Sequence, residues 1–218
     1  MTSYHAVAII EVMVRDNNRK QEIAEKALEL FSIYGYEATS LSMIAEAVGI
    51  RKASLFNHYS GKQAILDEII KTIVSDLNER SAFTGADWND EAYTSRFHGM
   101  GAGEASAMVI SHVKLITGDL NISRGRRVLM IEQFRDRDMA ALLTKQNYTD
   151  VMKFFTGMME FLIRDGVLEA RDPEIMAAQF ALPVTGWISL IDRDPERIGE
   201  VEDLIQRHVK SFFESYSK

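Results

Sequence analysis

Apolar side chains recur at three- and four-residue intervals along most of the chain, a spacing typical of amphipathic helices. No alternating apolar and polar run recurs, so no strand is expected. The pattern therefore predicts an all-helical (all-α) protein. Helices are expected at about 19–34, 41–48, 52–59, 62–80, 90–96, 104–117, 126–145, 147–165, 173–191 and 195–216.

Capping residues mark several of these helix ends. Asn18 with Gln21, and Ser60 with Gln63, have the spacing of capping boxes. Two acid-Pro-acid triplets each supply an N-cap, a proline at the first helical position and an acid in the first turn. Other expected caps and stops are Ser40, Gly35, Gly49, Gly166, Asp172-Pro173-Glu174 and Asp194-Pro195-Glu196.

Composition fits a soluble globular protein but excludes some functions. The 218 residues carry a net charge of −7, which argues against a protein that coats nucleic acid without sequence preference. Residues 15–72 are neutral, with eight basic and eight acidic residues, so a DNA contact there needs local placement of charge. There is no cysteine and no run of about 18 uninterrupted apolar residues, which favours a cytoplasmic protein with no membrane span.

Cofactor and metal sites find little support in the sequence. The Gly-rich run HGMGAGEASA at 98–107 resembles a phosphate-binding loop, but no strand precedes it, so a break between helices is favoured. The five histidines are scattered without an i, i+4 pair, and no metal site is expected. No nucleophile and base converge, so neither an enzyme nor a cofactor is predicted.

Residues 40–59 have the spacing of a helix-turn-helix. Ala45 is small where two helices must approach, Gly49 follows four residues later, and Leu55 six residues after that. A generic helical hairpin can show the same pattern. The run GIRKASLFNHYSGK then presents small, polar and basic groups opposite its apolar anchors.

Residues 19–66 resemble the DNA-binding domain of the TetR family of transcriptional regulators. The run ALELFSIYGYEATSLSMIAEAVGIRKASLFNHYSGKQAIL carries the resemblance, from Ala27 and Phe31 through Thr39-Ser40 to His58-Tyr59 and Lys62. The resemblance implies an N-terminal arm (1–18), a helix-turn-helix DNA-binding domain (19–61) and a ligand-binding and dimerisation domain (62–218).

The resemblance also implies that helix 52–59 lies in the major groove of double-stranded DNA. Lysine, serine and asparagine are residue types that donate to phosphates or base edges, and alanine allows close approach. Tyr59 is also a candidate core residue. The predicted DNA-contacting residues are Ser40, Ser42, Lys52, Ala53, Ser54, Asn57, His58, Tyr59 and Lys62.

Three positions depart from the family pattern. Arg51 stands where a capping Ser or Thr is common, so the cap of the recognition helix is weakened. Phe56 replaces a common Tyr and has no hydroxyl for a phosphate. Ser60-Gly61 replaces a common Pro-Ser and is still expected to cap the next helix.

The body suggests a cavity and a dimer interface. Met and aromatic residues suit a cavity for a small, mainly apolar effector, although such residues are also ordinary core. The candidate ligand-binding residues are Met100, Met108, His112, Phe134, Phe155 and Met159. The last two helices offer faces for a four-helix interface or for burial within one chain. The candidate dimerisation residues are Phe180, Val184, Trp187, Ile188, Ile205, Val209 and Phe212.

The sequence thus predicts a homodimeric DNA-binding regulator, expected to repress from a palindromic operator and to respond to a small-molecule effector. A helical ligand-binding or scaffold dimer without operator recognition is the alternative. The operator, the effector and the direction of its effect are not encoded in any motif.

Overall fold

The computed structural model describes residues 2–81, 83 and 85–217, and the expected all-helical class is confirmed for them. An isolated antiparallel bridge joins Leu168 to Ser217. The α-helices are α1 (Thr2–Tyr34), α2 (Leu41–Val48), α3 (Lys52–Leu55), α4 (Lys62–Arg80), α5 (Glu91–Thr94), α6 (Ala102–Gly118), α7 (Leu120–Glu132), α8 (Arg137–Thr144), α9 (Asp150–Arg164), α10 (Pro173–Arg193) and α11 (Ile198–Tyr216). Short 3-10 turns cover Ser95–Phe97 and Pro195–Arg197, and a π turn covers Lys145–Thr149.

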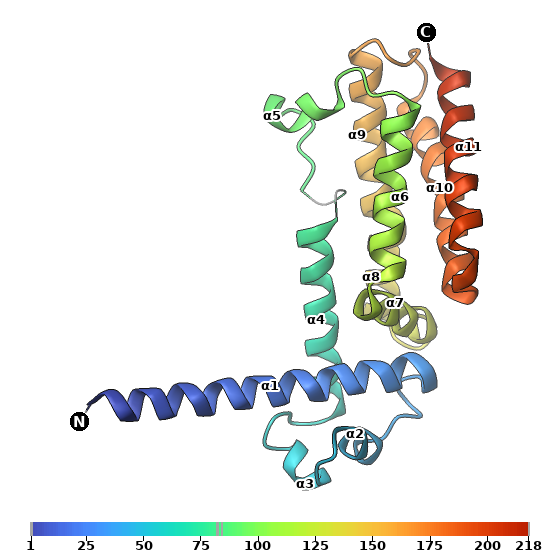
Figure 1. The fold of residues 1–218 in the computed structure, drawn as a ribbon. Helices are drawn as coiled ribbons and strands as arrows, with labels where there is room; N and C mark the ends of the chain where they lie inside the picture. The colour runs from blue at the N-terminus through green and yellow to red at the C-terminus, as the bar shows by residue number, and fades with distance from the viewer. Residues whose placement is uncertain (1, 82, 84, 218) are drawn as a thin grey trace.

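A small head and a larger helical body are joined by α4 (Figure 1). In the head, α2 and α3 pack beneath the C-terminal half of α1, and α4 rises from them towards the body. The body consists mainly of α6, α9, α10 and α11, which lie alongside one another. Helices α7 and α8 lie at the end of the body that faces α1, so α7 contacts both α1 and α4.

The first helix begins much earlier than expected. It runs unbroken from Thr2, so Asn18 and Gln21 lie inside it and do not form a capping box. The side chain of Gln21 instead donates to Glu25, one helical turn further on. A capping pattern marks a helix start only if the preceding residues leave the helix, and here they do not.

The expected helix 126–145 is two helices. Asp136 interrupts it: its carboxylate accepts hydrogen bonds from the backbone N–H groups of Asp138 and Met139 and so caps α8. The apolar positions continue across the break, which is why periodicity alone joined the two segments. The π turn then replaces the expected start at Asn147.

Two other helix starts differ from expectation. Helix α4 begins after Gly61 with no side-chain cap, so the Ser60–Gln63 box does not form. Asp194 is followed by a 3-10 turn without a side-chain cap, and α11 starts at Ile198. By contrast Asp172 caps α10 as expected, accepting from the N–H groups of Glu174 and Ile175.

Two clusters of buried side chains form the core. One belongs to the body. The other fills the head and continues along α4 through Ile69 and Ile73 to Val128 and Leu129 of α7. The head therefore packs against α7 of the body, and the two share one buried cluster.

Helix α10 is long and apolar enough to cross a membrane by length and composition, with a mean hydropathy of 1.3 in its most apolar window. In the structure it packs against α9 and α11. Among the described residues 39% of that window is buried, and two large apolar residues of the helix, Ile175 and Leu182, are exposed.

Candidate DNA-binding site

The turn between α2 and α3 is set by a glycine. Gly49 has φ +74°, in the left-handed region that favours glycine. It lets the backbone N–H of Ile50 donate to the carbonyl of Ala45 at 2.9 Å, which closes α2. At the other end of α2 the Ser40 hydroxyl accepts from the N–H of Met43, confirming Ser40 as the cap.

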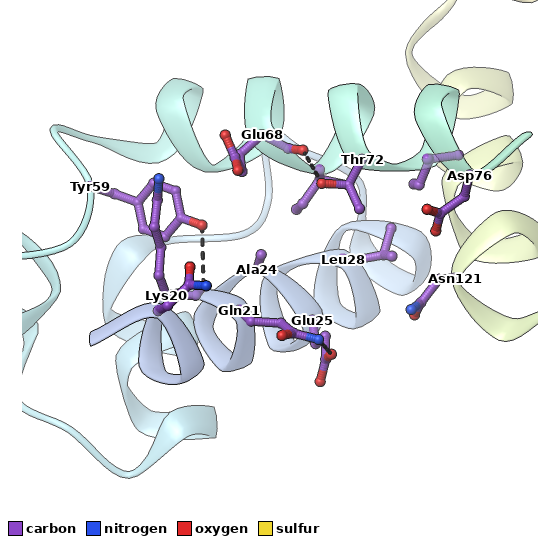
Figure 2. A pocket seen from close by; sticks show the side chains of 13 residues that line it. Lys20, Gln21, Ala24, Glu25, Leu28, Tyr59, Glu68, Thr72, Asp76 and Asn121 are labelled. Carbon is purple, nitrogen blue, oxygen red and sulfur yellow. Dashed lines mark hydrogen bonds between the residues drawn. The ribbon is translucent and has the colours of Figure 1, made fainter. Parts of the chain in front are cut away.

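Residues 52–59, the segment predicted to read DNA and called the recognition segment below, are anchored by Leu55 and Tyr59. Leu55 is fully buried in the head, and Tyr59 is 5% exposed. Figure 2 shows the Tyr59 hydroxyl near Lys20, where it donates to that residue's backbone carbonyl at 3.1 Å. Burial, and then the charge of Glu68, raise the pKa of Tyr59 to about 12. Tyr59 thus attaches the recognition segment to α1. Its hydroxyl hydrogen is donated within the head and is not available to a DNA phosphate.

The opposite face of the segment is open to solvent. Lys52, Ala53 and Asn57 are exposed, while Ser54 and His58 are half-buried. The α-helix itself ends at Leu55 and turns continue to His58, so the helix is shorter than expected. These five side chains share one short segment and form what we call the reading face.

Arg51 lies just before this face in the chain, and Phe56 lies within the same segment. Arg51 provides no side-chain hydrogen bond to the start of α3, which confirms the weak cap. Phe56 is 51% exposed, an unusual position for a large apolar ring in a monomeric head. Ser42 is exposed on α2, and Ser40 is exposed while serving as the cap.

Lys62 has a role within the head that the sequence pattern did not reveal. Its ammonium donates to the carbonyls of Tyr36 at 2.7 Å and Thr39 at 3.0 Å, and lies 4.1 Å from the centroid of the Tyr36 ring. These carbonyls belong to the loop between α1 and α2. Lys62 therefore holds that loop against α4, in addition to any phosphate contact.

A groove of about 410 Å³ runs between α1 and α4, beside Tyr59 (Figure 2). Its floor is apolar, with Leu28 and Ile69, and its rim carries one base, Lys20, and three acids, Glu25, Glu68 and Asp76. A negative rim repels the DNA backbone. This groove is therefore a poor candidate for a DNA contact, and the reading face stays the predicted one.

Helix α7 ties the head to the body. The buried carboxylate of Glu132 accepts from the backbone N–H of Tyr36 at 2.9 Å. At Gly125 an added Cβ would lie 2.2 Å from Cδ1 of Ile73, so α4 approaches α7 closely there. Arg126, one residue on, pairs through Nη2 with Asp192 of α10 at 2.7 Å, and both side chains are over nine-tenths buried.

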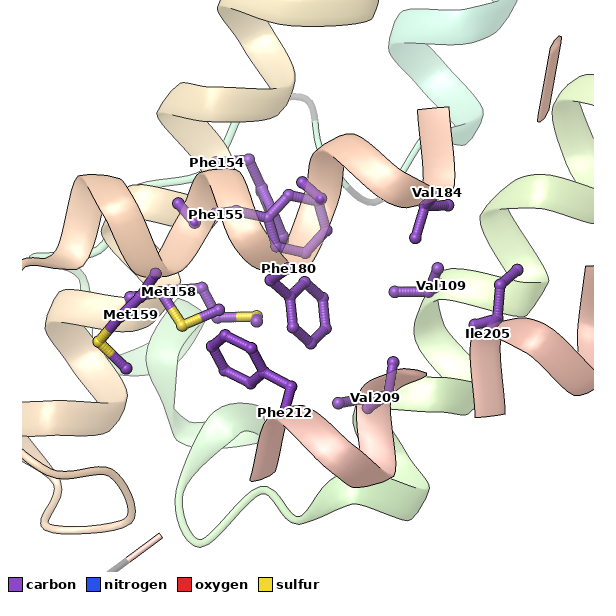
Figure 3. Close-up of a cluster of buried hydrophobic side chains, with 14 of the residues drawn as sticks. Val109, Phe154, Phe155, Met158, Met159, Phe180, Val184, Ile205, Val209 and Phe212 are labelled. Atoms are coloured by element: carbon purple, nitrogen blue, oxygen red, sulfur yellow. The ribbon is translucent and has the colours of Figure 1, made fainter. Parts of the chain in front are cut away.

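The candidate ligand residues do not all gather in one place. Phe155, Met159 and Met100 are buried in the body core (Figure 3 labels the first two), and Met108 and His112 are half-buried. Phe134 is 90% exposed, after the end of α7. Its position outside the core corrects its assignment to a cavity, because an exposed ring encloses nothing.

The expected dimer residues lie mostly inside the chain. Phe180, Ile205, Val209 and Phe212 pack into the body core, with Val184 and Ile188 also buried (Figure 3). This corrects their assignment to the surface between copies, because α10, α11 and α6 bury them against one another. Trp187 is half-buried. Sequence periodicity does not distinguish these two kinds of burial.

Sequence reasoning also missed a group of aromatic residues between α4 and α6. Phe83 lies 4.0 Å from His112 and 4.6 Å from Phe154, measured between ring centroids. Trp88 packs against Gly157, where an added Cβ would come within 2.2 Å of its ring. The signal available was the density of aromatic residues in this otherwise polar segment: Phe83, Trp88, Tyr93 and Phe97.

A small cavity of about 70 Å³ with mixed polar and apolar walls lies next to Phe83, between α4, α6, α7 and the π turn. His112 and Arg126 line it together with Ser81, Gln146 and Asp150. Burial, and then the charge of Arg126, lower the pKa of His112 to about 4, so its ring is neutral at pH 7.

Comparisons with known proteins agree with this geometry. Residues 23–69 match the family model described as bacterial regulatory proteins, tetR family. The negative transcriptional regulator IcaR of the biofilm operon icaADBC in Staphylococcus aureus is 41% identical over 59 residues, which cover 27% of this chain and 32% of IcaR. The match thus spans about a third of this curated relative.

Solved structures extend the likeness to the whole fold. A putative TetR-family regulator from Mesorhizobium loti superposes with a TM-score of 0.65 at 17% identity, covering 94% of this chain and 99% of that one. AibR, in complex with isovaleryl coenzyme A and operator DNA, gives a TM-score of 0.59 at 19% identity, covering 86% and 96%. The helix-turn-helix head thus matches the DNA-binding domain of the TetR family of transcriptional regulators, and the chain as a whole has the fold of that family's solved structures.

Proposed function

We propose that the chain is a dimeric repressor that binds a roughly palindromic operator and is released or retained by a small, mainly apolar effector. The observation that carries the proposal is the reading face. Lys52, Ala53 and Asn57 are exposed there because Leu55 and Tyr59 take up the buried positions of the same segment. A binding role that requires no catalysis accounts for this arrangement.

The reading face has the chemistry that base recognition requires. Asn57 offers an amide that pairs in bidentate fashion with an adenine edge, and Lys52 donates to guanine or to phosphate. Ala53 lets the backbone approach a thymine methyl. Ser40, Ser42, Ser54 and His58 flank these groups and are proposed to reach phosphates, as is Lys62 once its loop contacts are made.

The outward side of α10 supports the dimer. Ile175 is 55% and Leu182 38% exposed there, and Gly186 leaves room for close helix approach. Only 39% of the helix's most apolar window is buried among the described residues of the chain. A second copy related by a two-fold axis would bury this side against its own counterpart and place two heads on successive half-sites.

Effector control is supported by the position of α7. It contacts α1 and α4 and is paired through Arg126 with α10. A molecule bound in the body that moves α7 would therefore change the angle of both head helices. It acts only to the extent that it binds one head arrangement more tightly than the other.

The proposal is tested by selecting binding sites from a library of random DNA duplexes with the full chain. The expected result is an enriched, two-fold symmetric sequence with half-sites about one helical turn apart. No enrichment over the starting library would sink operator recognition and favour a helical scaffold dimer. An enriched single half-site would retain DNA recognition but sink the dimer.

A further inference from the structure

The small cavity beside Phe83 is lined by Arg126, a buried residue with an unsatisfied hydrogen-bond donor. Arg126 is 6% exposed, and its Nε–H has no partner among the described residues, although Nη2 pairs with Asp192. A buried donor without an acceptor costs free energy, so an acceptor at this place would be stabilising. Arg126 lines the cavity, and its volume of about 70 Å³ accommodates such a group.

Phe83 lines the same cavity and packs among aromatic residues of the body. Its ring lies 4.0 Å from His112, 4.6 Å from Phe154 and 5.1 Å from Phe155. Phe83 is half-buried and comes from the irregular segment that follows α4, not from a helix of the body. A ring held by a loop among core aromatics can be replaced by a ring of similar size without dismantling a helix.

The charges around the cavity decide which acceptor fits. Arg126 is balanced by Asp192, and Asp150, which also lines the cavity, is paired with Lys145. His112 is neutral at pH 7. A carboxylate would add a charge beside Asp150, and an ammonium would meet the guanidinium of Arg126. A neutral oxygen avoids both penalties.

We propose that this site binds a single-ring aromatic molecule with a neutral oxygen acceptor, such as an aryl ketone, ester or amide. The ring takes the place of the Phe83 side chain against His112, Phe154 and Phe155, and the oxygen enters the cavity and accepts from Nε–H of Arg126. The inference rests on the proposed function, because it names the effector class of the same regulator.

Displacement of Phe83 couples ligand binding to the head through α4. Ser81 follows α4 directly, and its hydroxyl contacts Nδ1 of His112 at 3.4 Å and accepts from the N–H of Phe83 at 3.2 Å. When Phe83 leaves, these contacts at the end of α4 change. Helix α4 carries that change to the recognition segment, which lies just before its first residue.

The test uses two probes of nearly equal shape: acetophenone, which carries a carbonyl, and α-methylstyrene, which carries a methylene instead. Isothermal titration with the full chain should give acetophenone about tenfold tighter binding, since one probe satisfies the buried donor and the other does not. Benzoate and benzylamine should bind more weakly than acetophenone. Equal binding of acetophenone and α-methylstyrene would overturn the proposal.

Variants separate the ring site from the acceptor site. Phe83→Ala, with Phe83→Leu as a milder change if the first does not fold, should bind both probes about tenfold or more tightly because no ring must be expelled. Phe134→Ala, which removes an exposed ring of the same size, should bind like the wild type. Arg126→Met, made together with Asp192→Asn so that no unpaired charge remains, removes Nε–H and should abolish the preference for acetophenone.

DNA binding is measured on the same samples without ligand. This measurement distinguishes a failure of the ligand site from a failure of the proposed regulatory function. Sequence-selective DNA binding together with unchanged probe binding in Phe83→Ala and Phe83→Leu would refute the ring site alone. Loss of DNA selectivity with normal probe binding would refute the regulator alone, and the site would remain as a ligand site.

Discussion

Glu132 of α7 and Tyr36, just after α1, are joined by a 2.9 Å hydrogen bond from the backbone N–H of Tyr36 to Oε1 of a carboxylate that is 3% exposed. The residues are 96 positions apart, and the bond ties the head to the body at the start of the loop between α1 and α2. Hydrogen bonds to a charged group are about twice as strong as neutral ones.

The first prediction concerns this bond. Glu132→Ala leaves the N–H of Tyr36 unsatisfied and should lower the free energy of unfolding by about 1–3 kcal/mol. Urea denaturation measures the change. Glu132→Gln keeps an oxygen acceptor of the same shape and is the control, expected to lose less. Equal losses in both variants would show that charge alone, and not the hydrogen bond, stabilises this contact.

The second prediction separates two lysines of the head. Lys62→Met removes the ammonium that binds the carbonyls of Tyr36 and Thr39, and should destabilise the chain by about 1–3 kcal/mol. Lys52→Ala removes an exposed side chain and should leave stability within about 0.5 kcal/mol of the wild type. Lys52→Ala should instead weaken DNA binding and reduce its salt slope by about 1. Matching stability losses would contradict the assigned roles.

The close approach of α4 and α7 makes a third prediction. Gly125→Ala places Cβ against Cδ1 of Ile73, and the resulting repacking should cost about 1–3 kcal/mol. Ile73→Val removes that carbon. The double variant should therefore be more stable than the sum of the single changes implies, as measured by a double-mutant cycle. Simple additivity would mean that the two side chains do not meet.

The pH dependence of stability should report His112. Its pKa is about 4 in the folded chain against 6.5 in the unfolded chain, so the unfolded state binds more protons between these values. Stability should thus fall as pH is lowered from about 6.5 to about 4, by at most about 3 kcal/mol from this group. His112→Asn should reduce the fall measured by denaturation at pH 7 and pH 5. An unchanged difference would show that His112 is solvated.

A substitution on the outward face of α10 tests the proposed dimer. Leu182→Asp places a charge on the surface proposed to meet a second copy, and should weaken dimerisation by about 2 kcal/mol or more in analytical ultracentrifugation. Leu120→Asp changes a leucine of α7 that is 69% exposed and is the control. A wild-type chain that is monomeric at all concentrations would contradict the dimer itself.

Local signals predicted the head well because they act over a few residues. Ser40 and Gly49 set the ends of α2 through their own backbone contacts, and these contacts need no distant partner. The anchor Leu55 follows from the same spacing. The role of Lys62 did not follow, because its carbonyl partners lie 23 to 26 residues earlier and become neighbours only after folding.

The body was predicted in class but not in detail. An apolar stripe looks the same whether it is buried by its own chain, as Phe180 is, or by a second copy. Residue type alone suggests Phe134 for a cavity, but it lies exposed between the end of α7 and the start of α8. The unmet donor of Arg126 depends on packing among helices far apart in sequence, and no local pattern reports it.

Substitution of Asn57 tests most directly whether the reading face recognises a base sequence. Fluorescence anisotropy of wild type and Asn57→Ala, on the selected operator and on a random duplex over a range of salt concentrations, gives the discrimination between the two DNAs. Asn57→Ala is expected to lose about 1–3 kcal/mol of discrimination while its affinity for random DNA is unchanged. Full discrimination in the variant would contradict this expectation.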